Sequence, residues 1–93
     1  MKYINWNFEK NKKLIEERNI LFEMCLLKIQ SEEILDILYN KNYPKQKIFV
    51  LEIKNYIYLI PFIETDEEVF LKTIIPSRKF TKKYLLNKKD EKN

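Results

Sequence analysis

The chain has 93 residues, of which 45% are hydrophobic and 34% are charged, and its formal charge is +4. This length and balance predict one small globular domain, residues 1–93, whose last residues 88–93 form a frayed tail. The sequence contains no Gly and no His. It therefore cannot carry a Gly-rich phosphate loop, a dinucleotide fingerprint or the usual nucleophile elbow. The lack of imidazole excludes Ser-His-Asp and Cys-His catalysis and Cys/His zinc fingers.

The cysteine content and the N-terminal residues indicate the cellular compartment in which the protein is expected. Cys25 is the only cysteine, and a lone thiol can neither form an intramolecular disulfide nor complete a zinc site, which indicates a reducing environment. The N-terminal segment carries Glu9 and Lys10 where a signal peptide would have an apolar core, and no apolar run reaches membrane-spanning length. We therefore expect a cytoplasmic protein with no membrane contact.

Two helices are expected in the first third of the chain. The first covers residues 8–18, with Asn7 as its N-cap. Asn19 follows, and it is well suited to the left-handed conformation that ends a helix. The second helix covers residues 20–29 and is apolar nearly all the way round, which predicts a heavily buried element that holds Cys25 as an unreactive core thiol.

Strands are expected in the middle of the chain. Residues 34–39 form a short β-rich run, and two longer β-branched and aromatic runs, 47–54 and 56–63, meet at Asn55 as a hairpin. One side of this hairpin is apolar throughout and should receive the helices. The other side carries Glu52 among apolar residues, so it is either a second packed layer or a shallow cleft. The first side consists of Phe49, Leu51, Ile53, Tyr56, Tyr58, Ile60 and Phe62.

The end of the chain holds the net positive charge. A fourth strand, residues 69–75, is followed by a helix that begins at Pro76 or Ser77 and ends near Asn87. From Lys72 onward the chain has eight Lys or Arg and two acidic residues, whereas the first 71 residues sum to −2. One side of the helix is aromatic and should dock, while the other is cationic. Phe80 and Tyr84 lie on the first side, and Arg78 and Lys82 lie on the second.

A resemblance emerges from the order of elements and from several short sequences. A short strand, two helices, four strands and a basic helix are the order expected of a compact α+β ribonuclease toxin. The short sequences are Trp6-Asn7, Lys10-Asn11, Ile20-Leu21-Phe22-Glu23 and Ile75-Pro76-Ser77-Arg78-Lys79-Phe80-Thr81-Lys82-Lys83. Together they resemble the BrnT family of type II toxins, which belongs with the RelE-like ribonucleases, over about residues 3–86. The family's usual Lys-His-Gly is Glu17-Arg18-Asn19 in this chain, and Thr73 beside Lys72 stands where the family has an Arg.

The resemblance implies an α+β fold with two N-terminal helices, a mainly antiparallel four-stranded sheet and a C-terminal basic helix. It implies an endoribonuclease toxin that acts on RNA and is neutralised by a cognate antitoxin, commonly of the ribbon-helix-helix type. Operator DNA would be contacted only through that antitoxin. No cofactor and no metal ion are expected.

The chemistry available to such a ribonuclease suits this composition. The 2′-hydroxyl of RNA can attack its own phosphate once positioned, so the protein supplies charge stabilisation and proton transfer. Arg and Lys serve the first task, and a carboxylate is one candidate for the second. The predicted catalytic residues are Arg78, Lys82, Lys72 and Glu52, and the predicted RNA-binding residues are Arg18, Lys79 and Lys83.

Two other interpretations compete with this one. The cations of the terminal helix are also what a solvated helix face would carry. The missing imidazole favours a non-enzymatic protein of the same fold that binds a partner protein or nucleic acid. An independent DNA-binding module is less favoured, because the terminal helix follows a sheet and has no preceding helix at helix-turn-helix spacing.

Overall fold

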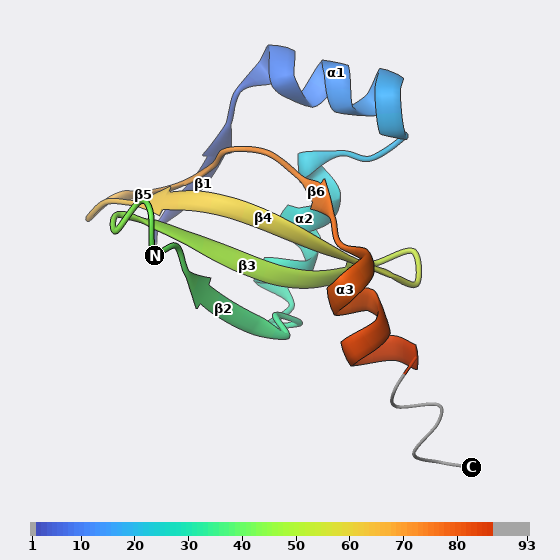
Figure 1. Cartoon of the computed structure of the whole chain (residues 1–93). Helices are drawn as coiled ribbons and strands as arrows, with labels where there is room; N and C mark the ends of the chain where they lie inside the picture. The colour runs from blue at the N-terminus through green and yellow to red at the C-terminus, as the bar shows by residue number, and fades with distance from the viewer. Residues whose placement is uncertain (1, 87–93) are drawn as a thin grey trace.

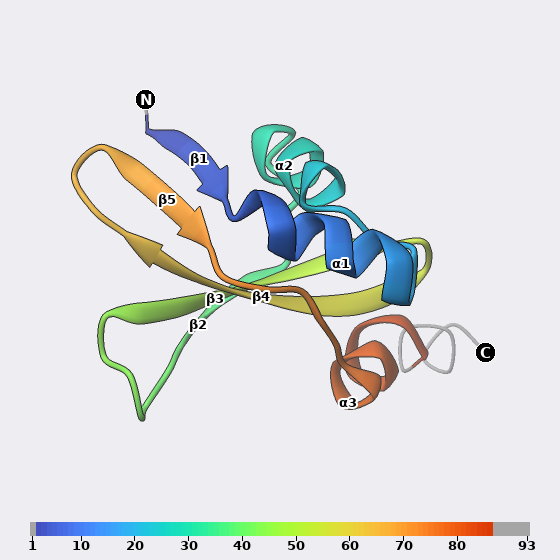
Figure 2. The same cartoon turned by 90° about the horizontal axis from the view of Figure 1, so that it is seen from above.

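Two helices cover one face of a mixed sheet, and a short terminal helix lies on the opposite face (Figures 1 and 2). The computed structural model describes residues 2–86; the predicted end of the last helix at Asn87 and the predicted tail 88–93 lie outside them. Among the residues described, no helix combines the length and the apolar character that a bilayer span requires. The elements are β1 (Tyr3–Trp6), α1 (Phe8–Arg18), α2 (Phe22–Gln30), β2 (Asp36–Tyr39), β3 (Gln46–Ile53), β4 (Tyr56–Glu64), β5 (Glu68–Leu71), β6 (Ile75–Pro76), α3 (Arg78–Thr81) and the π-helical turn η1 (Lys82–Leu86).

The sheet confirms the α+β class and corrects its details. Its strand order is β1-β5-β4-β3-β2, with β6 also paired to β4, so six strands replace the predicted four. Strand β1 runs parallel to β5, and the other four pairings are antiparallel. The predicted strand 69–75 is split into β5 and β6, which follow one another along the same edge of β4.

The β3–β4 hairpin has the predicted faces. Its turn consists of Lys54 and Asn55, both with positive φ (55° and 63°), which is the twist that a two-residue hairpin loop requires. The side that faces α1 and α2 forms the main core, where the Phe49 and Phe62 rings stack with centroids 3.9 Å apart. The buried members of this core are Leu14, Ile20, Phe22, Cys25, Phe49, Leu51, Ile53, Ile60, Phe62, Val69, Leu71 and Ile74.

The ends of α1 follow the predicted chemistry. The Asn7 side chain accepts a hydrogen bond from the Lys10 backbone N–H at 2.9 Å, which caps the first turn. Asn19 closes the helix at φ 52° and ψ 42°, the left-handed conformation expected of it.

Asn11 ties α1 to α2. It is 6% exposed, its Oδ1 accepts from the backbone N–H of Phe22 at 2.8 Å, and its Nδ2 donates to Glu23 Oε1 at 2.8 Å. Helix α2 has no side-chain cap of its own, because its N-cap position is Leu21. Asn11 therefore satisfies a free amide at the start of α2 from the neighbouring helix.

We expect Asn11→Ala to lower the free energy of unfolding by about 1–3 kcal/mol, since it leaves the buried Phe22 N–H without its acceptor. Urea unfolding followed by circular dichroism measures this. Asn42→Ala is the matched control, because Asn42 is exposed in a loop and its loss should change stability by less than about 0.5 kcal/mol. Equal stability of the two variants would contradict the tie between the helices.

Cys25 is fully buried on α2, as predicted, and burial raises the pKa of its thiol to about 12. Only the thiolate reacts readily with disulfide reagents. We expect the native protein to resist such a reagent at pH 8 and the urea-unfolded protein to react at once. Absorbance of the released thiol measures both rates, and rapid stoichiometric labelling of the native protein would contradict this burial.

Candidate nucleic-acid interface

The terminal helix is held on the sheet by a serine and a threonine. Ser77 donates its backbone N–H to Ile57 O at 2.9 Å, and its Oγ accepts from Phe80 N at 3.2 Å to cap α3. Thr81 is 8% exposed; its Oγ1 accepts from Ile57 N at 2.9 Å and donates to Ser77 O at 2.7 Å. The sequence prediction of docking through Phe80 and Tyr84 missed Thr81. Those two aromatic residues are half-buried and stack on each other with centroids 6.1 Å apart.

The terminal cations are Arg78, Lys79, Lys82 and Lys83, and all four side chains are exposed. Within residues 2–86 none of them forms an ion pair. The Lys83 ammonium lies 5.7 Å from the centroid of the Phe80 ring and 5.6 Å from that of Tyr84. Glu52 is half-buried on β3 and pairs with Ile57, the residue to which α3 is bonded. The structure thus brings Glu52 to the part of the sheet where the terminal helix docks.

Lys72 lies elsewhere. It occupies the break between β5 and β6, where its backbone N–H donates to Pro61 O at 2.8 Å. Ser77, which starts α3, bonds to Ile57 O, four residues away along β4 and therefore about 13 Å from the Lys72 contact. Lys72 is thus anchored apart from the start of the helix that carries Arg78, although the sequence grouped the two residues in one site.

Lys72 instead joins cations from α1. A hollow of about 570 Å³ is lined by Asn7, Glu9, Lys10, Lys13, Phe70 and Lys72. A smaller one of about 210 Å³ shares Lys10 and Lys13 and is also lined by Leu14, Glu17, Arg18 and Thr73. We call Lys10, Lys13, Arg18 and Lys72 the cationic groove. Within the described chain none of the four forms an ion pair.

Two contacts fix the ends of the cationic groove. Arg18 Nη1 donates to Ile74 O at 3.1 Å, which holds the guanidinium against the chain that follows Lys72. The Lys72 ammonium lies 5.8 Å from the centroid of the Phe70 ring, a favourable position for a cation over an aromatic face. Acidic side chains also line the hollows, at Glu9 and Glu17. The groove therefore combines cationic side chains with nearby carboxylates.

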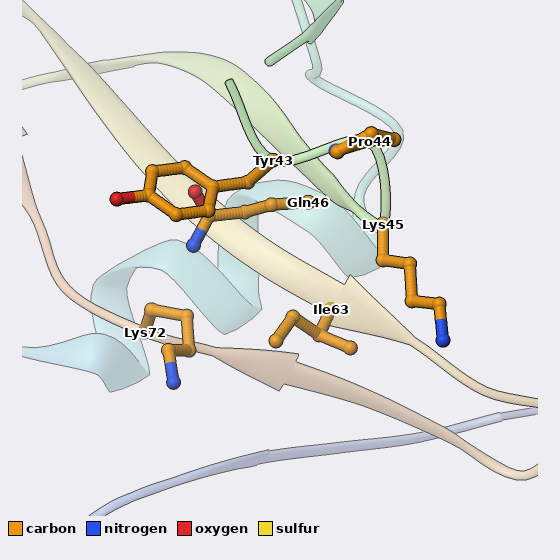
Figure 3. A pocket seen from close by; sticks show the side chains of 6 residues that line it. All are labelled: Tyr43, Pro44, Lys45, Gln46, Ile63 and Lys72. Carbon is orange, nitrogen blue, oxygen red and sulfur yellow. The ribbon is translucent and has the colours of Figure 1, made fainter. Parts of the chain in front are cut away.

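Lys72 also borders a third hollow, of about 580 Å³ (Figure 3). We call it the Tyr43 hollow; it is lined by Tyr43, Pro44, Lys45, Gln46, Ile63 and Lys72. Since Lys72 lines both, the cationic groove and the Tyr43 hollow adjoin at this side chain. An aromatic and aliphatic surface next to a row of cations is the combination that binds single-stranded nucleic acid.

Of the predicted site residues, the structure places Lys72 and Arg18 on the cationic groove and Arg78, Lys79, Lys82, Lys83 and Glu52 at or beside the terminal helix. The sequence prediction did not include Lys10, Lys13 or Tyr43. A signal was present for the two lysines, because residues three apart on a helix share a face.

Searches for matching protein-family models, curated proteins and solved structures return no match for this chain. In residues 2–86, acidic and cysteine side chains do not gather in a group of three that could hold a metal ion. The evidence for function therefore lies in the surfaces of the chain itself.

We expect Thr81→Val to lower the free energy of unfolding by about 1–3 kcal/mol, because the buried Ile57 N–H loses its acceptor. Urea unfolding of this variant and of Lys79→Ala provides the comparison. Lys79 is exposed two residues earlier on α3, and its loss should change stability by less than about 0.5 kcal/mol. A neutral Thr81→Val would mean that the hydroxyl does not hold the terminal helix.

Proposed function

We propose that this protein is the toxin of a toxin–antitoxin pair, a metal-independent endoribonuclease whose RNA substrate lies along the cationic groove. One observation carries the proposal: Lys72 lines both the hollow that holds α1 cations and the Tyr43 hollow, so phosphate contacts and an aromatic ring lie on adjoining surfaces. The α+β fold and the resemblance of the chain to BrnT-like toxins support it.

The groove contains groups suited to the reaction. The 2′-oxygen of the RNA attacks the adjacent phosphorus, the bond from phosphorus to the 5′-oxygen breaks, and a cyclic phosphate and a free 5′-hydroxyl result. The negative charge that grows on the phosphoryl oxygens is stabilised by Lys72 and Arg18, since fixed cations are most effective where they need not reorganise. Arg18 is already oriented by Ile74 O. It supplies charge and hydrogen bonds and cannot act as a base.

Proton transfer requires an acceptor for the 2′-hydroxyl proton and a donor for the 5′-oxygen. Glu9 and Glu17 are the carboxylates that line the hollows of the groove, and Lys10 or Lys13 can donate to the leaving oxygen. Glu52 belongs to a separate candidate centre with Arg78 and Lys82, beside the terminal helix. The two centres make different predictions for mutants.

A neutralising antitoxin would have to cover the groove. A surface with four cations that form no ion pair with a described residue is matched by a partner rich in Asp and Glu. We therefore propose a cognate antitoxin of the ribbon-helix-helix type that places acidic side chains on the groove. Operator DNA would be bound by that partner and not by this chain.

A second candidate function is binding without catalysis, in which the chain associates with a partner protein or nucleic acid. The observation that favours it is the separation of Glu52 from the cationic groove, which leaves the expected proton acceptor away from Lys72. The same groove would then bind RNA through phosphate contacts, and affinity would still fall steeply with salt.

We expect the purified chain to cut single-stranded RNA in the presence of EDTA and to leave 2′,3′-cyclic phosphate ends. Lys72→Ala should lower the cleavage rate about 10²-fold, since it removes one charge contact to the reacting phosphate. It should also reduce the salt slope of RNA binding by about 0.7. Gel analysis of end-labelled RNA measures the rate, and fluorescence anisotropy measures the binding.

Lys12→Ala is the matched control, because Lys12 is an exposed lysine of α1 outside the residues that line the groove. This variant should cleave RNA at nearly the rate of the original chain. If Arg78→Ala and Glu52→Gln abolish cleavage while Lys72→Ala does not, the reacting centre is at the terminal helix. Salt-dependent binding of RNA with no cleavage by any variant would establish the second candidate function. If the chain neither binds nor cuts RNA, both candidate functions are wrong.

A further inference from the structure

We infer that the Tyr43 hollow is a nucleobase subsite, in which one unstacked base of single-stranded RNA lies on the Tyr43 ring while its phosphate contacts Lys72. This inference rests on the proposed function and specifies how the substrate is held. It also restricts the substrate, because bases inside a duplex are stacked on one another and cannot reach an aromatic side chain.

The ring of Tyr43 is exposed where a ligand can contact it and is not packed in the core. The side chain is 64% exposed and lines the hollow, and Figure 3 shows the ring across from Ile63 and Lys72. Most of the lining is carbon: the ring, Pro44 and Ile63 supply the apolar surface, and the charged ends stand at the margin. A flat, partly apolar ligand with an attached anion fits this arrangement.

The loop that carries Tyr43 is preorganised. Its two ends are joined because Asn40 N donates to Gln46 O at 3.2 Å and Gln46 N donates to Tyr43 O at 2.8 Å. Asn40 Oδ1 also accepts from Asn42 N at 2.9 Å. Pro44 restricts the backbone of the residue before it to extended conformations, which limits the movement of the ring. The loop therefore loses little conformational entropy when a ligand binds.

The polar groups at the margin match the rest of a nucleotide. Gln46 Oε1 accepts from Asn40 Nδ2 at 2.9 Å, so the amide nitrogen is the part of this side chain that can donate to a base. Lys72 and Lys45 place ammonium groups on two sides of the hollow. From Lys72 the RNA backbone continues to Lys10 and Lys13, which extends the contact from one nucleotide to several.

The test uses a fluorescent 2′-O-methyl oligouridylate, which has the base and phosphate groups but no attacking hydroxyl. We expect Tyr43→Ala to weaken its binding by roughly 5- to 150-fold, the effect of losing one base–aromatic stack. Tyr43→Phe should bind like the original chain, because it keeps the ring. Tyr3→Ala is the matched control, since Tyr3 is 76% exposed on β1 and lies outside the hollow.

A photochemical experiment adds an independent readout. The same oligonucleotide with 5-bromouridine is expected to crosslink to Tyr43 on irradiation, as identified by peptide mass spectrometry. The duplex form should give neither the crosslink nor a difference between Tyr43→Ala and the original chain.

The outcomes separate the two claims. If Tyr43→Ala binds RNA as tightly as the original chain while Lys72→Ala binds it more weakly, the subsite proposal is wrong and the proposal of RNA binding by the groove is kept. Crosslinks that form only at other tyrosines lead to the same conclusion. If the original chain binds no RNA, the proposed function fails and the subsite with it.

Discussion

The side chain of Asn11 is the tie on which the position of the cationic groove depends. By bonding to Phe22 N and to Glu23, it fixes the angle about the α1 axis at which the helix faces α2 and the core. At about 100° per residue, Lys10 and Lys13 then fall on one flank of α1 and Lys12 falls on the other. A single buried amide thus decides which lysines border the sheet edge and which face solvent.

The break between β5 and β6 is the second determinant. A continuous strand would give Lys72 one fixed side of the sheet, but here the chain leaves the ladder after Leu71 and rejoins it at Ile75. The Lys72 backbone bonds to the carbonyl of Pro61, a residue that cannot itself donate to a ladder. Lys72 therefore stands at the margin between the Tyr43 hollow and the α1 cations, where the two surfaces adjoin.

Local features of the fold could be read from the sequence, and non-local ones could not. The Asn7 cap, the left-handed Asn19 and the two-residue turn at Asn55 each follow from the chemistry of a few neighbouring residues. The parallel pairing of β1 with β5 joins residues more than sixty positions apart, and no local pattern encodes it. Thr81 was missed for a different reason: a search for apolar docking residues overlooks a hydroxyl that satisfies a buried backbone amide.

The candidate site shows that charge counted along the chain differs from charge gathered in space. The sequence concentrates positive charge after Lys72 and leaves the first 71 residues at −2, which directed attention to the terminal helix. The cationic groove instead takes Lys10, Lys13 and Arg18 from the acidic part and only Lys72 from the basic part. Because screening limits each charge to about 10 Å at ordinary ionic strength, a phosphate responds to the cations beside it in space and not to the balance of the segment. Folding builds that neighbourhood by placing α1 along the edge where the β5–β6 break presents Lys72, so the cationic groove arises from topology more than from composition.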